Sequence, residues 1–224
     1  MTRNFTRVKI KKKAINTLAK GGNMNKIITI GREFGSGGRE LGRRLAEYLG
    51  FEYYDREIIT EIAKRSEMSE KYVQQVIDSD PHSLFPITIG HTFAYINNYA
   101  IDHQQEVYRH NRDVLKSMAE KSNCVIVGSC ADYILKDYNP YKIFVYAEGD
   151  SKLARCRARE TEQEHLSDKK LKKYIKNVDK NRARFYEFYT GNVWGDKVNY
   201  DIMVNTSNVE IKKLIPMLAK MFKD

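Results

Sequence analysis

The stretches "IITI" (27–30) and "GREFGSGGRELG" (31–42) follow each other directly and decide the fold. The first is an apolar, β-branched run, which predicts a buried strand. The helical pattern of "RELGRRLAEYLG" (39–50) places four apolar or aromatic residues on one face: Leu41, Leu45, Tyr48 and Leu49. A strand, a glycine-rich turn and a helix N-terminus together bring several backbone N–H groups around one anion. The stretch therefore predicts a phosphate-binding loop.

The loop departs from the strict nucleotide-phosphate pattern, G-x-x-x-x-G-K-[ST]. Counted from Gly31, that pattern requires a glycine, a lysine and a serine or threonine where this chain has Ser36, Gly37 and Gly38. The lysine that normally reaches the phosphates is missing. Arg39 follows immediately and is the candidate replacement, because a guanidinium is always charged and can grip two phosphate oxygens. Its position at a helix start also allows it to point into solvent.

Two other interpretations of the loop stay open. Gly35, Gly37 and Asp55, which lies 20 residues after Gly35, fit the start and end of a dinucleotide-binding fingerprint. Glu40, however, stands where that fingerprint has its third glycine, and its side chain would obstruct close packing of helix on strand. The last interpretation is a tight loop that binds nothing.

Charge and composition narrow the class of protein. The chain has 224 residues and a net charge of +10, but residues 1–26 carry eight basic residues and no acid, which leaves 31 basic and 29 acidic residues elsewhere. The basicity thus belongs to a tail, so nucleic-acid binding is not expected of the body. No apolar run reaches the roughly 20 residues of a membrane helix. The three cysteines lack metal or disulfide spacing, which indicates reduced thiols in a cytoplasmic protein.

Strands and helices alternate along the chain. The predicted strands are 26–30, 51–54, 124–127, 142–146 and 200–205, with a capping box at 207–210 opening the last helix. Strands separated by helices predict an α/β fold with a five-stranded parallel sheet between helical layers. We expect a disordered tail at 1–25 and one domain at 26–224. Within that domain, residues 56–115 form a helical insert and 151–189 a second, arginine-rich helical stretch.

This layout resembles the nucleoside monophosphate kinases, which have a P-loop core, an acceptor-binding helical insert and an arginine-rich lid. More narrowly, the chain resembles the cytidylate kinase-like family. The segments that carry the resemblance are "IGREFGSGGRELGRRLAEYLGFEYYDREII", "CVIVGSCADYIL", "KIFVYAEGDSKLARCRARE" and "VDKNRARFYEFYTGNVWGDKVNYDIMVNTS". The resemblance implies a P-loop fold of three layers, with 56–115 as the acceptor-binding insert and 151–189 as the lid.

The resemblance also implies roles for single residues. Donor phosphates would be held by Gly31, Gly35, Ser36, Gly37, Gly38, Arg39 and Glu40. The acceptor would be bound by Tyr54, Asp55, Arg56, Ser129 and Asp132. The arginines expected to stabilise the transferring phosphoryl group are Arg39, Arg155, Arg159, Arg182 and Arg184. Asp55 could equally contact a metal or cap the following helix, and Asp132 could supply a carboxylate toward magnesium.

The chain departs from cytidylate kinases at the end of the third strand as well. Where those proteins have "DGRD", Val127 replaces an acid and Ser129 replaces an arginine that holds the acceptor phosphate. We therefore expect a kinase that uses ATP and Mg²⁺ to phosphorylate a nucleoside monophosphate, such as CMP, or another small phosphorylated acceptor. The alternative is a catalytically inactive nucleotide-binding or regulatory protein on a kinase scaffold.

Overall fold

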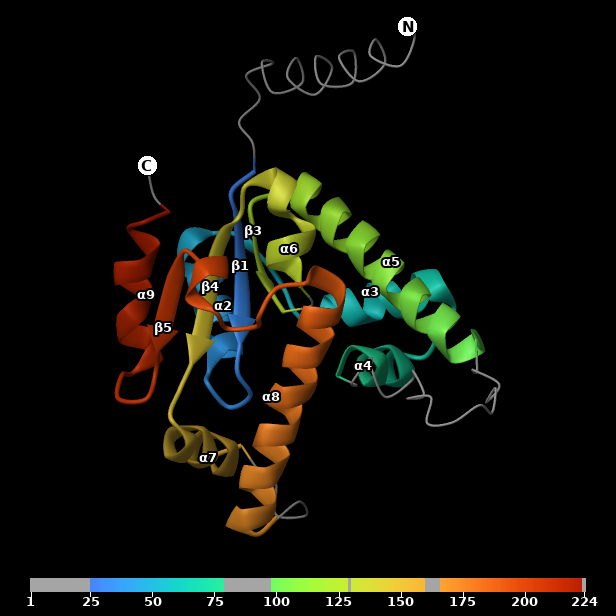
Figure 1. Cartoon of the computed structure of the whole chain (residues 1–224). Helices are drawn as coiled ribbons and strands as arrows, with labels where there is room; N and C mark the ends of the chain where they lie inside the picture. Colours follow the sequence, from blue (N-terminus) through green and yellow to red (C-terminus); the bar gives the residue numbers. More distant parts are fainter. Residues whose placement is uncertain (1–24, 79–97, 129, 160–165, 223–224) are drawn as a thin grey trace, which may run out of the picture.

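The centre of the molecule is a five-stranded parallel sheet (Figure 1). A computed structural model describes residues 25–78, 98–128, 130–159 and 166–222. The strand order is β2-β3-β1-β4-β5, and the strands are β1 (Ile27–Arg32), β2 (Glu52–Tyr54), β3 (Cys124–Val127), β4 (Tyr141–Tyr146) and β5 (Ile202–Asn205). The buried, β-branched runs of β1 and β3 occupy the middle of the sheet, since such strands are covered on both faces.

Helices connect the strands and form the outer layers. They are α2 (Gly38–Leu49), α3 (Arg56–Ser66), α4 (Glu70–Asp78), α5 (Asn98–Lys121), α6 (Ala131–Ile134), α7 (Gly149–Arg157), α8 (Asp168–Thr190) and α9 (Ile211–Ala219). Two short 3₁₀ helices, η2 (Lys136–Tyr138) and η4 (Lys197–Asn199), complete the described elements. In Figure 1, α7 and α8 project beyond the end of the sheet at which β1 and β4 terminate.

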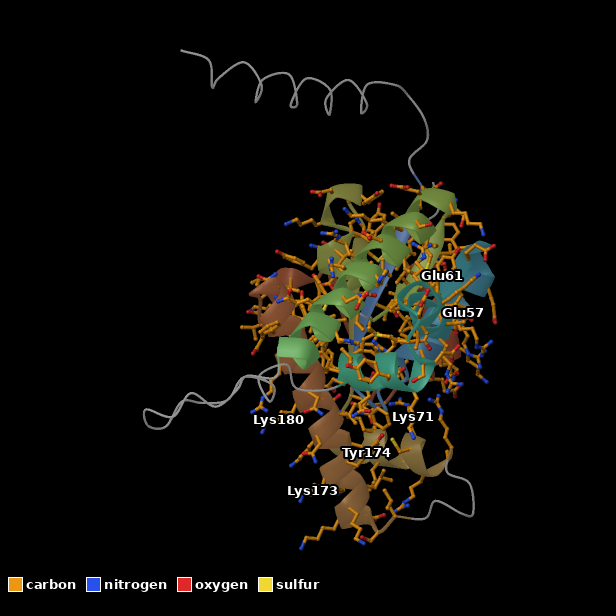
Figure 2. The ribbon with its side chains drawn as sticks, turned by 90° about the vertical axis from the view of Figure 1, so that its right-hand side faces the viewer. Glu57, Glu61, Lys71, Lys173, Tyr174 and Lys180 are labelled. Atoms are coloured by element: carbon orange, nitrogen blue, oxygen red, sulfur yellow. The ribbon has the colours of Figure 1, made fainter. Side chains whose placement is uncertain are left out.

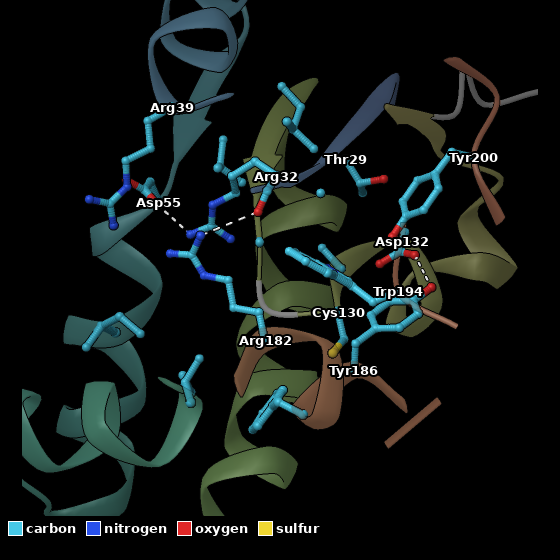
Figure 3. A pocket seen from close by; sticks show the side chains of 18 of the residues that line it. Thr29, Arg32, Arg39, Asp55, Cys130, Asp132, Arg182, Tyr186, Trp194 and Tyr200 are labelled. Carbon is cyan, nitrogen blue, oxygen red and sulfur yellow. Dashed lines mark hydrogen bonds and ion pairs between the residues drawn. The ribbon is translucent and has the colours of Figure 1, made fainter. Parts of the chain in front are cut away.

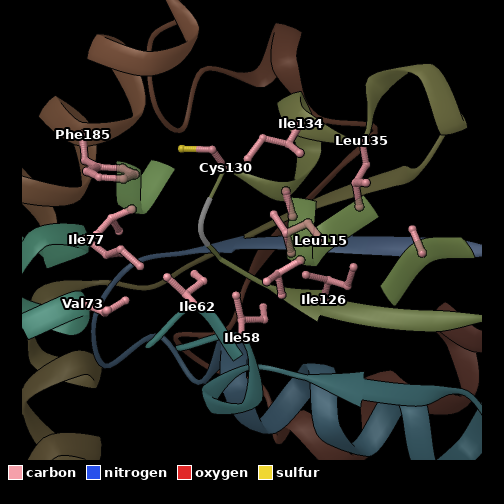
Figure 4. Close-up of a cluster of buried hydrophobic side chains, with 14 of the residues drawn as sticks. Ile58, Ile62, Val73, Ile77, Leu115, Ile126, Cys130, Ile134, Leu135 and Phe185 are labelled. Carbon is pink, nitrogen blue, oxygen red and sulfur yellow. The ribbon is translucent and has the colours of Figure 1, made fainter. Parts of the chain in front are cut away.

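Two apolar cores lie on opposite faces of the sheet. One joins α2 and α9 to the strands through residues such as Leu41, Leu45 and Ile215. The other contains Ile58 and Ile62 of α3 together with side chains from α4, α5, α6, α8 and β3 (Figure 4). The result is the three-layer α/β fold, with a five-stranded parallel sheet, that the sequence predicted.

The strand order places a crevice at the ends of β1 and β3. Successive strands lie on either side of β1, and in such open sheets ligands bind outside the carboxyl ends of the strands where the order reverses. Ile30 is in register with Val127, and the N–H of Gly128 donates to the carbonyl of Ile30 at 2.9 Å. The residues that follow β1 and β3 are therefore held beside each other.

Two local predictions are wrong. Tyr48, which was placed on the apolar face of α2, is 48% exposed, whereas Leu41 and Leu45 are fully buried. The capping box at 207–210 is absent, since α9 starts at Ile211 after Glu210. The Ser207 hydroxyl instead accepts the N–H of Glu148 at 2.8 Å, which ties the start of α7 to the end of β5.

Candidate functional site

The glycine-rich loop between β1 and α2 presents a helix N-terminus to the crevice. Gly35 and Gly37 have φ values of 75° and 82°, which L side chains rarely adopt, and Gly37 caps the helix that begins at Gly38. The first N–H groups of a helix have no acceptor inside it. Those of α2 therefore provide an anion-binding terminus at the head of the loop.

Ser36 stabilises the conformation of this loop through buried hydrogen bonds. Its side chain is fully buried and its hydroxyl donates to the carbonyl of Glu33 at 2.8 Å. The Thr206 hydroxyl, also buried, donates to the Ser36 carbonyl at 2.7 Å and so joins the loop to the end of β5. The hydroxyl of Ser36 is thus committed to the loop's own structure, and only the backbone around it remains for an anion.

Arg32, the last residue of β1, occupies the space beside the loop. A β-carbon on Gly38 would lie 2.5 Å from the Arg32 β-carbon, and one on Gly128 would overlap the Arg32 guanidinium. The side chain therefore passes between two glycines, one at the start of α2 and one at the end of β3. It is only 16% exposed. The absence of side chains at positions 38 and 128 makes room for this cation.

Two arginines pair with Asp55, and a third, Arg182, contacts the backbone of one of them (Figure 3). The Arg39 Nε lies 2.8 Å and the Arg32 Nη2 3.8 Å from the Asp55 carboxylate, while Arg182 of α8 donates to the Arg32 carbonyl at 3.4 Å. The side chain of Asp55 does not cap α3. One carboxylate among three guanidinium groups leaves excess positive charge at the mouth of the crevice.

A cavity of about 60 Å³ lies between this arginine cluster and the opposite wall, to which Asp132, Tyr186, Trp194 and Tyr200 contribute. The Tyr186 hydroxyl donates to Asp132 at 2.6 Å. Burial raises the pKa of Asp132, although the hydrogen bond from Tyr186 opposes the shift. This carboxyl is therefore a member of a buried pair rather than an exposed charge.

A second cavity, of about 710 Å³, lies on the other side of the loop. Its volume falls in the range of small-molecule sites, roughly 300–1,000 Å³. Gly35, Gly37 and Gly38 line it, and so do Arg155 and Arg159 of the segment around α7. Arg155 Nη1 is buried with no hydrogen-bond partner in the described part of the chain, and burial lowers the pKa of Arg155. The unpaired Nη1 indicates a place for an anion.

The two cavities share a boundary. Arg32, Arg39 and Arg182 line both of them, and β1, α2 and α8 each contribute one of these side chains. A group bound in one cavity and a group bound in the other would therefore face the same cations.

Lys152 of α7 fixes the loop to α8. Its ammonium lies 2.9 Å from Glu33 Oε2 and 2.7 Å from Asp179 Oδ2, and Asp179 also accepts the N–H of Phe34 at 2.6 Å. Burial lowers the pKa of Lys152, but the hydrogen bonds and charges of Asp179 and Glu33 outweigh it, so the pKa lies above its usual value. We refer to Lys152, Glu33 and Asp179 as the lysine bridge.

Several residues predicted for the site lie elsewhere. Gly31, by contrast, belongs to β1 and lines the smaller cavity, where a β-carbon would lie 2.8 Å from the Phe144 ring. Glu40 pairs with Arg44 at 2.9 Å and with Arg159 at 3.5 Å rather than facing the loop. Tyr54 and Arg56 line a separate hollow between α3 and α5. Arg184 lines neither of the two cavities described above. Ser129 lies outside the described residues.

The described residues offer no preformed cage for Mg²⁺. Among them, no three His, Cys, Asp or Glu side chains gather as a metal site. Asp55 is engaged by two arginines, and Asp132 is paired with Tyr186. Mg²⁺ commonly binds through substrate phosphates and keeps several waters, so it fits here only as part of a metal–triphosphate substrate.

Sequence reasoning missed two residues of the site. Arg32 carried a usable signal, since it ends the strand that precedes the loop, where ligands bind in open α/β sheets. Lys152 carried none, because its partners Glu33 and Asp179 are brought to it only by the fold.

No helix in the described parts of the chain is long and apolar enough to cross a membrane.

Comparisons with known proteins agree with this architecture. The model of the cytidylate kinase-like family matches residues 27–208. No curated protein matches the chain. Among solved structures, an uncharacterized protein from Eubacterium ventriosum is 26% identical with a TM-score of 0.62, over 88% of this chain and 98% of that one. A shikimate kinase from Bacteroides thetaiotaomicron is 17% identical with a TM-score of 0.54, over 88% of this chain and 98% of its own. A deoxyadenosine kinase from M. mycoides is 15% identical with a TM-score of 0.47, over 89% and 100%. The fold is that of the P-loop kinases.

Proposed function

Because the chain belongs to the cytidylate kinase-like family, we propose that it transfers the γ-phosphate of ATP, bound with Mg²⁺, to a nucleoside monophosphate such as CMP or to another small phosphorylated acceptor. The observation that carries this proposal is the shared boundary of the two cavities, where Arg32, Arg39 and Arg182 converge. Phosphoryl transfer depends on positioning and charge neutralisation more than on covalent chemistry, and a ring of guanidinium groups supplies both.

In this proposal the 710 Å³ cavity receives the donor. Its phosphates lie on the N-terminus of α2, between Gly37, Gly38 and the cations Arg155 and Arg159. The smaller cavity receives the phosphate of the acceptor, with Asp55 orienting Arg32 and Arg39 toward it. Residues 56–115 then serve as the acceptor-binding insert and 151–189 as the lid.

Arg32, rather than Arg39, replaces the missing lysine in this scheme. The two glycines that flank Arg32 hold its guanidinium beside the loop, and its side chain is 16% exposed. The Arg39 side chain is 45% exposed and already 2.8 Å from Asp55. A buried, preorganised cation contributes more to charge stabilisation than an exposed one, because water screens it less. Arg39 then acts mainly on the acceptor side.

A catalytically inactive nucleotide-binding protein is the second candidate. The ion pairs of Asp55 with Arg39 and Arg32 favour it, since they leave this carboxylate less able to hold a metal on the phosphates. For either candidate we propose a cytoplasmic location, where thiols such as those of Cys124 and Cys130 stay reduced.

The test is ADP formation from ATP and Mg²⁺ with a panel of nucleoside monophosphates and an acceptor-free control. Arg32→Ala should lower turnover about 100-fold or more, as expected for the loss of one stabilising cation. The matched control is Arg43→Ala, since the Arg43 side chain is 51% exposed and pairs with Glu47 of the same helix. Nucleotide binding without turnover in the wild-type protein would favour the inactive binding protein.

A further inference from the structure

One wall of the 710 Å³ cavity is apolar and aromatic. Phe34 of the loop, Leu166, and Leu171 and Tyr174 of α8 form it, and glycines of the loop and several arginines line the rest of the cavity. Tyr174 is 50% exposed and Leu166 40% exposed. Figure 2 shows Tyr174 on the part of α8 that extends past the sheet. Exposed apolar side chains that gather in a hollow that cations also line are typical of a binding site for a ligand with two chemically different ends.

The aromatic wall begins immediately beside the phosphate loop. Phe34 precedes Gly35 in the chain, and its backbone N–H is fixed by Asp179 of α8 at 2.6 Å. The Phe34 and Tyr174 rings are 5.4 Å apart at 86°, and the Arg182 guanidinium lies 5.6 Å from the centre of the Phe34 ring. The loop and α8 therefore hold an edge-to-face aromatic pair in the same cavity that the glycines of the loop line.

We propose that this aromatic wall binds the base of the donor nucleotide, with Tyr174 as its stacking surface. The inference rests on the proposed function, in which the donor phosphates lie against Gly37 and Gly38. A nucleoside triphosphate fits the cavity because its anionic end meets the arginines and its flat base meets Tyr174. Stacking on aromatic side chains is favourable for every base, since each base has a π-face.

The same wall indicates a site with little discrimination between bases. Of the described residues that line the cavity, Glu33 is the only one with a carboxylate, and none has an amide side chain. Glu33 is 2.9 Å from the Lys152 ammonium, within the lysine bridge. Because stacking on Tyr174 does not depend on the polar edge of the base, we expect ATP and GTP to bind with similar affinity.

The test compares the dissociation constants of ATP, GTP and inorganic tripolyphosphate, measured by calorimetry with Mg²⁺ present. Tyr174→Ala should weaken ATP and GTP binding between about fivefold and a hundredfold, because stacking contributes on that scale. Binding of tripolyphosphate, which has no base, should not change. Tyr174→Phe keeps the ring and should bind ATP as the wild type does. The matched control is Tyr48→Ala, an equally exposed tyrosine (48%) near the opposite end of α2.

Two results would overturn the base site alone. Either ATP affinity is unchanged in Tyr174→Ala, or ATP and tripolyphosphate lose affinity equally; both results leave the phosphotransferase proposal standing. A wild-type preference for ATP over GTP of more than about tenfold would overturn the tolerance for bases. If the wild-type protein binds neither ATP nor tripolyphosphate, the glycine-rich loop does not bind phosphate, and the proposed function fails together with the base site.

Discussion

Replacing Lys152 by methionine tests how the phosphate loop is held in place. The ammonium is 2.9 Å from Glu33 and 2.7 Å from Asp179, and its side chain is 10% exposed. At an effective dielectric constant of 20, each contact corresponds to about 6 kcal/mol of gross attraction. Desolvation of the three charged groups offsets most of this, so the intact bridge contributes little net free energy. Removing the lysine alone costs more, because the carboxylates of Glu33 and Asp179 then remain close together with no cation.

Breaking a buried ion pair by removing one partner costs about 3–5 kcal/mol. For Lys152→Met we expect a loss of about 3 kcal/mol in the free energy of unfolding, which in a chain of this size lowers Tm by roughly 6–12 °C. The assay is urea denaturation at neutral pH, with thermal unfolding alongside. Lowering the pH toward 4 should shrink the deficit, since burial raises the pKa of Asp179 and protonation then removes its uncompensated charge.

The double variant Lys152→Met/Asp179→Asn supplies the control. It removes one of the two stranded carboxylates, so it should be more stable than additivity of the single variants predicts, by about 1 kcal/mol or more. If the losses in free energy of unfolding are additive, or if Lys152→Met loses less than about 1 kcal/mol, the lysine bridge does not hold the loop in place.

Three further predictions concern the loop, the buried carboxyl and the core. Gly38→Ala places a methyl 2.5 Å from the Arg32 β-carbon, so it should lower the free energy of unfolding by about 1–2 kcal/mol and weaken ATP binding. Gly149→Ala, whose added β-carbon meets nothing within 4 Å, should change neither quantity. Denaturation measures the stability and calorimetry the binding. Burial raises the pKa of Asp132, so the folded state retains this proton longer than the unfolded chain, and the contribution of Asp132 to stability falls as the pH rises through the folded pKa. The stability advantage of the wild type over Asp132→Asn should shrink across that window, and a constant difference would contradict it. Ile62→Ala, at a fully buried position of α3, should cost about 2–5 kcal/mol in denaturation experiments, against less than about 0.5 kcal/mol for Met217→Ala, which is 68% exposed.

Local pattern was enough to predict the strands and the loop. β3 begins and ends at Cys124 and Val127 as predicted, because a continuous apolar run in a parallel sheet has unambiguous ends. The capping box at 207–210 was wrong for a tertiary reason. The Ser207 hydroxyl accepts from Glu148, a residue of another segment, and is therefore not available to α9.

The missing lysine shows which part of the site could not be predicted from the sequence. Adjacency in sequence favoured Arg39, which lines both cavities and also pairs with Asp55 at 2.8 Å. The absence of a side chain at Gly38 opens the space beside the loop to Arg32, six residues earlier in the chain. No spacing rule along the chain could reveal this, because Gly128, the other boundary of that space, belongs to the end of a different strand.

By itself the sequence determined the fold class, the order of strands and helices along the chain, and the presence of a glycine-rich helix N-terminus, since each depends on periodicity and backbone conformation over a few neighbouring residues. Only the tertiary structure decided which cations face that terminus. The parallel sheet brings the ends of β1 and β3 together, and α8 returns across them, so that Arg32, Arg39 and Arg182 border both cavities. Charges so far apart in the chain become one site only when packing fixes the distances between them.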